Sequence, residues 1–389
     1  MQMLRYVTVL PTAFGAAQAV AGFAAVRAFA GRRARPASIA APVTILKPVC
    51  GDENLLEEAI SSFCVQQYPC YQLVIGAQDP DDPALEVARR LQRRFADCDI
   101  TIVIDPTWHG SNRKIANLIN MLPFAKHDLL VFADSDLHVR PDYLTRVVDA
   151  LQEPGTGLVT TLYGGEPAVD GSAAQLGASH ISHTFLPGAL LAVALGRQDN
   201  LGVTMALRRH TLEQVGGLCG LVEHLADDAV LGRKVRELGM AVRLADTIPM
   251  VTVQERSLGS LWLHEMRWAR TSGSMAPRAF AASVLQFPLF WALVGLLMSG
   301  GARWAELCYV AAWVVRGAVV HGIDRELRAR CPRPPRRTPF WLLPVRDVLS
   351  TVQVVVSYWS DVVVWRGHRM RADHGVLGPM VPAAEALDT

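Results

Sequence analysis

The middle of the chain, from Val43 to about Val253, alternates short apolar runs with amphipathic segments. Runs rich in β-branched residues predict strands, and apolar residues recurring every three or four positions predict helices. Strands are expected over 43–46, 71–77, 100–104, 128–133 and 157–162, and helices over 53–67, 83–95, 112–121, from 141 onward and 229–238. This alternation predicts an α/β fold in which helices cover both faces of a parallel sheet.

The N-terminal segment has a different pattern. Residues 6–26 carry no formal charge. This uncharged run is about as long as a helix needs to be to cross a bilayer. Four arginines follow it and predict a cytosolic C-terminal side: Arg27, Arg32, Arg33 and Arg35. The alternative is a cleaved signal peptide, but its positive charges normally precede the apolar run. We therefore expect residues 1–35 to form a transmembrane anchor.

Three further apolar segments follow residue 278. The first two, 279–302 and 307–323, are expected to form a membrane hairpin that turns at Ser299, Gly300 and Gly301, with the arginine-rich stretch 325–337 as a cytosolic loop. The third, 340–365, contains Arg346, Asp347 and Asp361, so it is either a poor span or an interfacial segment. If it spans, Arg366, Arg369 and Arg371 fall on the outer side, against the positive-inside tendency. These segments predict two to three C-terminal transmembrane helices.

The composition fits a chain of two unlike parts. Of its 389 residues, 51% are hydrophobic and only 19% are charged, whereas about a quarter are charged in an ordinary soluble protein. The net charge of +2 excludes a strong general attraction to nucleic acid. Seven scattered cysteines without CxxC spacing fit reduced thiols on the cytosolic side of a membrane.

Acidic residues follow two of the expected strands. Asp79 comes after the strand 71–77, and Asp134 and Asp136 come directly after the strand ending at Ala133. Ligands bind at the carboxyl ends of parallel strands, and two carboxylates two residues apart can hold Mg²⁺ or Mn²⁺, which in turn binds a diphosphate. The alternative is an Asp-rich turn.

Two later segments carry further candidate chemistry. Asp227 and Asp228 stand at the start of a helix, where they either cap it or supply a general base of raised pKa. The helical segment 261–269 brings His264, Arg267 and Trp268 together. An arginine can bind a diphosphate and a tryptophan can close over a sugar or base. The same segment can also lie on the membrane as an amphipathic helix.

Taken together, these motifs resemble the D, D-x-D, D, (Q/R)-x-x-R-W signature of membrane-bound inverting glycosyltransferases with a GT-A fold. Within that class the chain looks like the ceramide glucosyltransferase family, and most like its bacterial relative, the hopanoid-biosynthesis glycosyltransferase. The resemblance covers almost the whole chain and rests on segments 45–48, 78–83, 114–117, 226–228, 358–361 and 365–366. His264 departs from the signature, because the family usually has Gln or Arg there.

The resemblance implies a role for each motif residue. Pro48, Asp79 and Lys114 would bind the nucleotide, Asp79 through the uracil or ribose. Asp134 and Asp136 would hold the metal and the diphosphate, and His264, Arg267 and Trp268 would close the site. Asp228, with Asp227 beside it, would take the proton from the acceptor hydroxyl. The expected partners are a UDP-sugar and a lipid, and the mostly apolar segment 172–195 either guides that lipid or packs in the core.

The resulting hypothesis is a multi-pass inner-membrane enzyme whose catalytic domain faces the cytoplasm. It would move N-acetylglucosamine from UDP to a hopanoid polyol such as bacteriohopanetetrol. A ceramide glucosyltransferase is the nearest alternative. A polysaccharide synthase would need more membrane helices, and a non-catalytic scaffold would not need the intact acids. The expected parts are the anchor, a catalytic domain, an interfacial helix and the membrane segments with the tail, over 1–35, 36–260, 261–278 and 279–389.

Overall fold

The computed structural model describes residues 2–32, 40–333, 336–360, 362–365, 368–373 and 376–377. Several charged residues of the expected membrane ends lie outside these ranges: Arg33, Arg35, Asp361 and Arg366.

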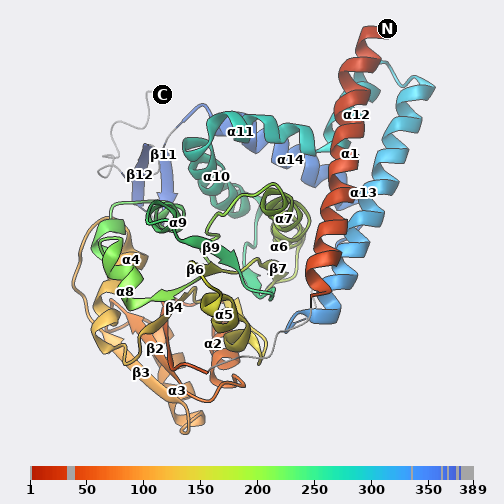
Figure 1. Ribbon diagram of the computed structural model, residues 1–389. Coiled ribbons are helices and arrows are strands. Elements are labelled where there is room, and N and C mark those ends of the chain that lie inside the picture. The colour runs from red at the N-terminus through yellow and green to blue at the C-terminus, as the bar shows by residue number, and fades with distance from the viewer. Residues whose placement is uncertain are drawn as a thin grey trace.

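A seven-stranded sheet forms the centre of the globular part (Figure 1). Its strands, in spatial order, are β3 (Asp99–Ile104), β2 (Tyr71–Ala77), β1 (Val43–Pro48), β4 (Leu129–Ala133), β8 (Thr204–Arg208), β6 (Thr156–Thr160) and β9 (Ala241–Leu244). β8 runs antiparallel to both of its neighbours, so the expectation of an entirely parallel sheet is wrong at this strand. The reason is its point of entry: the chain reaches β8 at the carboxyl end of β4, where the Asp134 amide donates to the Val203 carbonyl at 3.2 Å.

Helices cover both faces of this sheet, as expected. On one face, α2 (Leu56–Cys64), α3 (Ala84–Arg94) and α5 (Tyr143–Gln152) pack against side chains such as Ile45 and Ile75. On the other, α4 (Arg113–Met121), α8 (Arg209–Gln214) and α9 (Asp227–Glu237) pack against Leu46 and Val74. Neighbouring residues of one strand thus enter opposite cores, which explains why the strands are apolar at almost every position.

A second, smaller sheet continues from the D-x-D segment. β5 (Leu137–His138) and β7 (Gly164–Pro167) flank β10 (Met250–Val253), and the Thr252 amide donates to the Asp136 carbonyl at 3.2 Å. The sequence pattern did not predict these short strands. Their effect is to fix the backbone just beyond the metal-binding candidates.

Two long helices pack side by side at the edge of the globular part: α1 (Gln2–Ala30) and α13 (Arg303–Arg330). Both are long and apolar enough to cross a membrane, over Arg5–Ala30 and Arg303–Arg330. A bent pair, Pro277–Gln286 and Pro288–Met298, can add a third span. The expected hairpin does turn after Ser299, but its first arm is broken by 66° at Phe287 because Pro288 starts a new helix, α12 (Pro288–Met298).

The expected loop 325–337 is helical in its first part, because α13 continues to Arg330. Leu327 on this extension and Ile323 just before it are buried with Val26 and Phe29 of α1. The same apolar cluster includes residues of α7 (Leu186–Ala194) and β10. The ends of both long helices are thereby part of the globular core.

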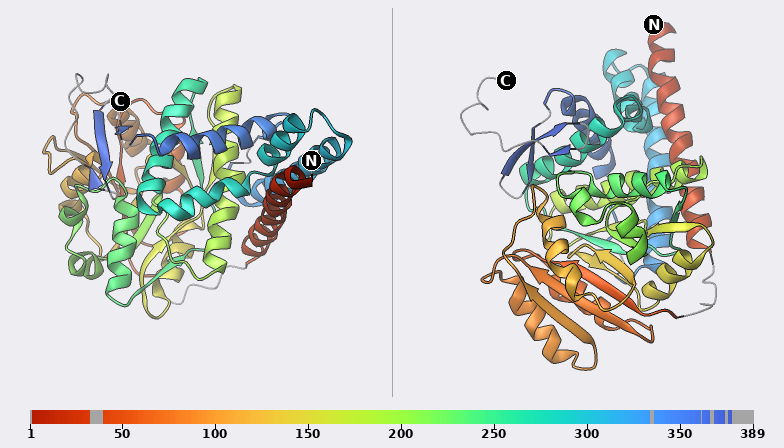
Figure 2. Two further views of the ribbon diagram at one scale, coloured as in Figure 1. Left: turned by 90° about the horizontal axis from the view of Figure 1, so that it is seen from above. Right: turned by 60° about the vertical axis from the view of Figure 1, so that its left-hand side comes forward.

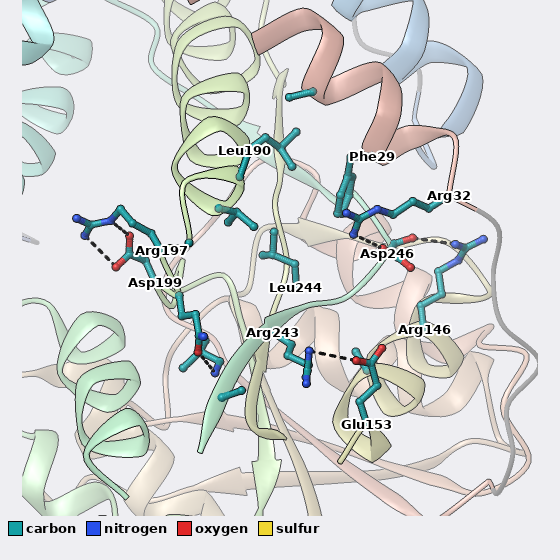
Figure 3. A pocket seen from close by; sticks show the side chains of 18 of the residues that line it. Phe29, Arg32, Arg146, Glu153, Leu190, Arg197, Asp199, Arg243, Leu244 and Asp246 are labelled. Carbon is teal, nitrogen blue, oxygen red and sulfur yellow. Dashed lines mark hydrogen bonds and ion pairs between the residues drawn. The ribbon is translucent and has the colours of Figure 1, made fainter. Parts of the chain in front are cut away.

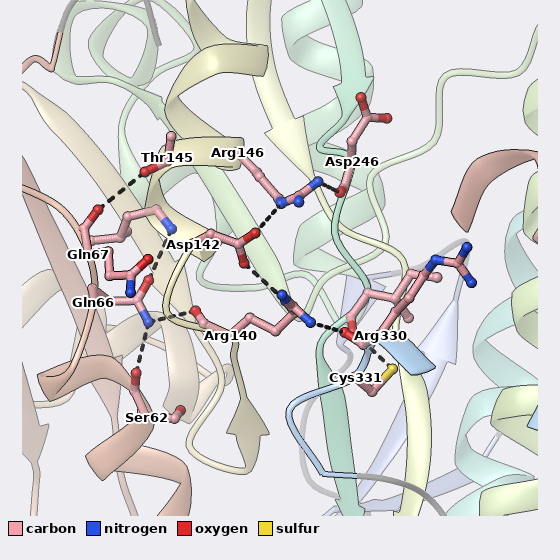
Figure 4. A network of polar contacts seen from close by, with 12 residues as sticks. Ser62, Gln66, Gln67, Arg140, Asp142, Thr145, Arg146, Asp246, Arg330 and Cys331 are labelled. Atoms are coloured by element: carbon pink, nitrogen blue, oxygen red, sulfur yellow. Dashed lines mark hydrogen bonds and ion pairs between the residues drawn. The ribbon is translucent and has the colours of Figure 1, made fainter. Parts of the chain in front are cut away.

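Polar contacts reinforce this junction (Figure 4). Arg140 donates to Asp142 at 3.1 Å and to the Arg330 carbonyl at 2.9 Å, while Arg146 donates to the Asp246 carbonyl at 2.8 Å. The carboxylate of Asp246 in turn pairs with Arg32, just after α1, at 3.1 Å. The region around α5 therefore holds the ends of α1 and α13.

The remaining helices lie between the sheet and the long helices: α6 (Ser172–His180), a π-helical turn over Ile181–Phe185, α10 (Leu258–Met275), α11 (Pro277–Ala282) and α14 (Leu342–Ser357). Figure 2 shows α10 and α14 together on the side of the sheet that carries the site. At the C-terminal end, β11 (Val362–Trp365), β12 (His368–Asp373) and β13 (Val376–Leu377) form a small antiparallel sheet.

Candidate active site

All ten residues singled out in the sequence line one cavity of about 580 Å³ at the carboxyl ends of β1, β2 and β4. They are Pro48, Asp79, Lys114, Asp134, Asp136, Asp227, Asp228, His264, Arg267 and Trp268. The cavity lies between the edge of the sheet and α10. The topology thus gathers residues that are far apart in the sequence.

The D-x-D segment is held by two lysines. Lys114 Nζ pairs with Asp134 Oδ1 at 2.6 Å, and the buried Lys47 Nζ donates to the Asp134 carbonyl at 2.5 Å. Lys114 stands in the first turn of α4, which Asn112 caps by accepting from the Ile115 amide at 3.1 Å. Burial opposes the charge of Lys114, yet the carboxylates of Asp134 and Asp227 raise its pKa above the ordinary value.

Asp136 lies deeper, among like charges. Burial raises its pKa to about 8, the charges of Asp134 and Glu53 act in the same direction, and Lys47 opposes them. A divalent cation would relieve this repulsion, and carboxylate oxygens are the donors that Mg²⁺ and Mn²⁺ accept. No group of three or more His, Cys, Asp or Glu is placed to hold a metal in the described part of the chain. A cation held by Asp134 and Asp136 would therefore need its other ligands from a diphosphate and water.

The acid pair stands in the first turn of α9. Asp227 Oδ1 accepts from Asn112 Nδ2 at 3.1 Å, and Asp228 Oδ1 accepts from the Ala229 amide at 2.7 Å. Burial, followed by the charge of Asp227, raises the pKa of Asp228 to about 7. A carboxylate with this pKa is suited to general-base chemistry near neutral pH.

The third part of the site comes from α10, which begins with a capping box between Ser257 and Ser260. The rings of His264 and Trp268 meet edge to face, with their centroids 4.5 Å apart. His264 Nδ1 also bonds to the carboxylate of Glu255, a contact that the sequence did not predict. Glu255 thereby holds the ring of His264, the residue at which this chain departs from the signature it resembles.

Comparison with known proteins places the chain in a family. The sequence model of Glycosyl transferase family 21 matches residues 7–377, nearly the whole chain. The chain belongs to glycosyl transferase family 21. It is 26% identical over 246 residues to ceramide glucosyltransferase 3 of Caenorhabditis elegans, a match that covers 62% of this chain and 52% of that protein. It is 21% identical over 346 residues to ceramide glucosyltransferase 1 of the same organism, covering 85% and 71%.

A solved structure supports the fold. The mannosyltransferase PcManGT from Pyrobaculum calidifontis, in complex with GDP-Man and Mn²⁺, superimposes with a TM-score of 0.53. The match covers 92% of this chain and 99% of that one at 17% sequence identity. This family 21 chain thus has a GT-A-like glycosyltransferase fold with a mixed sheet, and it carries two helices that are long and apolar enough to cross a membrane. The narrower resemblance to the hopanoid-associated enzymes remains a prediction.

Two residues that contact or crowd Asp228 in the candidate site were not identified from the sequence motifs. Asn200 Nδ2 donates to the Asp228 carbonyl at 3.0 Å. Gly202 adopts φ +87°, and a Cβ there would lie 2.7 Å from Asp228 Oδ2. Both stand in the loop before β8, so the antiparallel strand brings them to the candidate base. The only feature of the sequence that pointed to these two residues was Gly202 itself, a glycine between Asn200 and the strand β8.

Substituting Gly202 by Ala tests this packing. The added methyl group has to displace the Asp228 carboxylate, and a displacement of about 1 Å at a reacting group can cost about a hundredfold in rate. We expect kcat to fall by that order while KM for the donor changes little.

Gly196→Ala is the matched control. Gly196 has φ +89°, almost the same strain, but a Cβ there would meet nothing within 4 Å. Steady-state kinetics and thermal unfolding of both variants separate backbone strain from the effect on Asp228. Equal loss of activity in the two would contradict the positioning of the carboxylate by Gly202.

The raised pKa of Asp228 predicts a pH dependence. A general base must be ionised, and Asp228 holds its proton below about pH 7 because its pKa is raised to about 7. We expect kcat/KM to fall about tenfold per pH unit below this value and to level off above it. A pH profile of acceptor-dependent UDP release measures this, and a profile that stays flat through neutrality would argue against Asp228.

A second cavity, of about 1070 Å³, lies on the other side of the loop 196–199 (Figure 3). Its walls are Phe29 of α1, Leu190 of α7 and Leu244 of β9, and its arginines are paired with acids. These pairs are Arg32 with Asp246, Arg197 with Asp199, and Arg243 with Glu153. It contains none of the ten predicted site residues, and its paired guanidinium groups are poorly suited to a diphosphate.

Proposed function

We propose that this family 21 chain transfers a sugar from a UDP-sugar to a hydroxyl group of a membrane lipid, with inversion at the anomeric carbon. The observation that carries the proposal is the presence of Asp228, with its pKa near 7, in the same cavity as Asp134, Asp136 and Lys114. A base and a diphosphate-binding group on two walls of one cavity are what such a transfer requires.

The proposed reaction needs one proton transfer and one substitution. Asp228 takes the proton of the acceptor hydroxyl, whose oxygen bonds to the anomeric carbon as the bond from that carbon to the β-phosphate oxygen breaks. Because attack comes from the side opposite UDP, an α-linked donor yields a β-linked product. UDP leaves as an anion, next to the positive charges of Lys114 and Arg267.

The other residues bind and orient the donor in this proposal. Asp134 and Asp136 would hold Mg²⁺ or Mn²⁺, which when bound neutralises charge on the diphosphate. Pro48 and Asp79 stand at the ends of β1 and β2, on the side where the nucleotide would lie. Trp268 and His264 face the cavity from α10 and would cover the sugar.

The lipid acceptor is proposed from the long apolar helices and from the family relatives. Our first choice is N-acetylglucosamine transfer to a hopanoid polyol, from the catalytic domain on the cytoplasmic side of the inner membrane. Glucose transfer to ceramide is a close second candidate, because the curated relatives reported above are named ceramide glucosyltransferases.

A direct assay distinguishes the two candidates. Purified protein in lipid nanodiscs is incubated with Mn²⁺ and either UDP-N-acetylglucosamine or UDP-glucose, together with bacteriohopanetetrol or ceramide. Mass spectrometry then identifies the glycolipid. Turnover of ceramide but not of the polyol would overturn our first choice, and no lipid product from any combination would overturn the proposed function.

A further inference from the structure

The helix α14 has its polar side chains buried and one row of its apolar side chains exposed, while its other apolar residues include the buried Leu342, Leu343 and Val354. Arg346 and Asp347 are almost fully buried, at 1% and 0% exposure. Further polar residues on the same buried side are Ser350, Thr351, Gln353 and Ser357. In contrast, three valines are largely exposed: Val345 at 47%, Val352 at 40% and Val355 at 48%. This is the reverse of an amphipathic helix on a water-soluble protein.

The exposed residues form one continuous stripe. Trp341, Val345, Val352, Val355 and Trp359 are exposed and, with the half-buried Val348 between them, follow one another in steps of three or four, so they lie along one side of the helix. Trp341 and Trp359, at 61% and 77% exposure, stand just beyond the two ends of α14. A contiguous apolar surface of this kind marks contact with a partner or a membrane, and tryptophan is enriched where membrane meets water.

The buried side of α14 is fully engaged in hydrogen bonds. Arg346 Nη1 donates to Glu265 Oε1 at 2.8 Å and Nη2 donates to Gln353 Oε1 at 2.9 Å, while Gln353 Nε2 donates to Glu265 Oε2 at 2.7 Å. Asp347 Oδ2 accepts from the Leu289 amide of α12 at 3.1 Å. Polar groups surrounded by lipid have to be satisfied by the protein itself, because water is absent there.

The length and direction of α14 argue against a spanning helix. It has 16 residues and is therefore about 24 Å long, shorter than the hydrocarbon core of about 30 Å. Figures 1 and 2 show it running across α1 and α13 rather than along them. It contacts α12 and α13, which carry further exposed apolar side chains: Leu297 on α12 and Leu307 on α13 are 71% and 72% exposed.

We infer that α14 is an in-plane membrane helix whose exposed stripe contacts the acyl chains of the bilayer, while its buried side holds α10. Glu265, the partner of Arg346, stands between His264 and Arg267 on α10. The helix α10, which carries these site residues, is therefore bonded directly to the lipid-facing helix α14 through Glu265 and Arg346. This inference concerns the surface of the chain and does not depend on which reaction it catalyses.

Photo-cross-linking tests the inference. The photoreactive residue p-benzoylphenylalanine replaces Val352 or Val355 in separate variants of the full chain, which are reconstituted in vesicles of phosphatidylcholine and phosphatidylglycerol and irradiated. Leu307 on α13 is the positive control, because it is expected to face lipid whether or not α14 does. Val65, 50% exposed just after α2, is the matched control in the globular part, because Figure 1 shows α2 well away from α14.

Mass spectrometry of the irradiated proteins decides the outcome. We expect phospholipid adducts at Val352 and Val355 similar in yield to those at Leu307, and none at Val65. Adducts between two protein chains at Val352 would show an interface between copies and would overturn the inference. So would the absence of lipid adducts at both valines in variants whose thermal unfolding matches that of the unmodified protein.

Discussion

Replacing Asp228 by Asn is expected to abolish most of the acceptor-dependent release of UDP. Asparagine keeps the shape of the side chain but cannot accept the proton, and loss of a positioned general base costs about 10² to 10⁴ in rate. The loss should appear in kcat, because Asp228 reacts with the acceptor and not with the donor. Steady-state kinetics with saturating UDP-sugar measures it.

The stability of this variant provides an internal control. Burial raises the pKa of Asp228, which means that the folded protein disfavours its charge. Ionisation of Asp228 therefore lowers the free energy of unfolding, and this loss grows as the pH rises from the ordinary pKa of an aspartate to about 7. Asparagine carries no charge, so the variant should have an unchanged or higher Tm at neutral pH. Asp149→Asn is a matched substitution outside the site, because burial raises the pKa of Asp149 too. Unchanged UDP release in the Asp228→Asn variant would show that another group is the base.

Replacing Asp136 by Asn is expected to remove the metal dependence of donor binding. Asparagine lacks the negative charge that favours binding of a divalent cation, and such a cation can contribute several kcal/mol by stabilising the charge that develops on the leaving diphosphate. We expect activity to fall by about a hundredfold or more. Titration of Mn²⁺ against UDP-sugar binding, by calorimetry, gives the direct measurement.

Asp81→Asn is the control for this variant. Asp81 is an exposed acid in the loop after β2, on the same side of the sheet but outside the cavity lining. The variant should bind Mn²⁺ and donor as the unmodified protein does. If Asp136→Asn kept the same Mn²⁺ dependence, the cation would have to be held elsewhere.

Five of the seven strands of the central sheet (β1, β2, β3, β4 and β6) could be predicted from sequence, because each is marked by a local apolar run. The apolar run ending at Ala133 forms a strand that is buried on both faces, so Asp134 stands directly at the carboxyl end of that strand. The rule that ligands meet the carboxyl ends of strands brought Asp79 together with Asp134 and Asp136, whereas Asp228, in the first turn of α9, was assigned to the site only through the resemblance. The order of motifs then led to the family.

What the sequence did not reveal depends on tertiary contacts. β8 has only five residues, with an exposed Arg208 at its end, and nothing local marks it as antiparallel. Asn200 and Gly202 act on Asp228 across 26 or more positions of the chain, and Glu255 contacts His264 from another segment. Such residues become visible only once the strands are assembled. The roles of the ten site residues remain predictions until the variants above are measured.

The junction between α1 and α13 also has a consequence for biosynthesis. Val26 and Phe29 near the start of the chain are buried against Ile323 and Leu327 near its end. While the ribosome is still making the intervening residues, the end of α1 lacks its partner and leaves an apolar surface beside a nearly finished sheet. The last steps of folding must therefore wait until α13 has emerged, and C-terminal truncations before Arg303 should leave a membrane-tethered chain prone to aggregation and degradation.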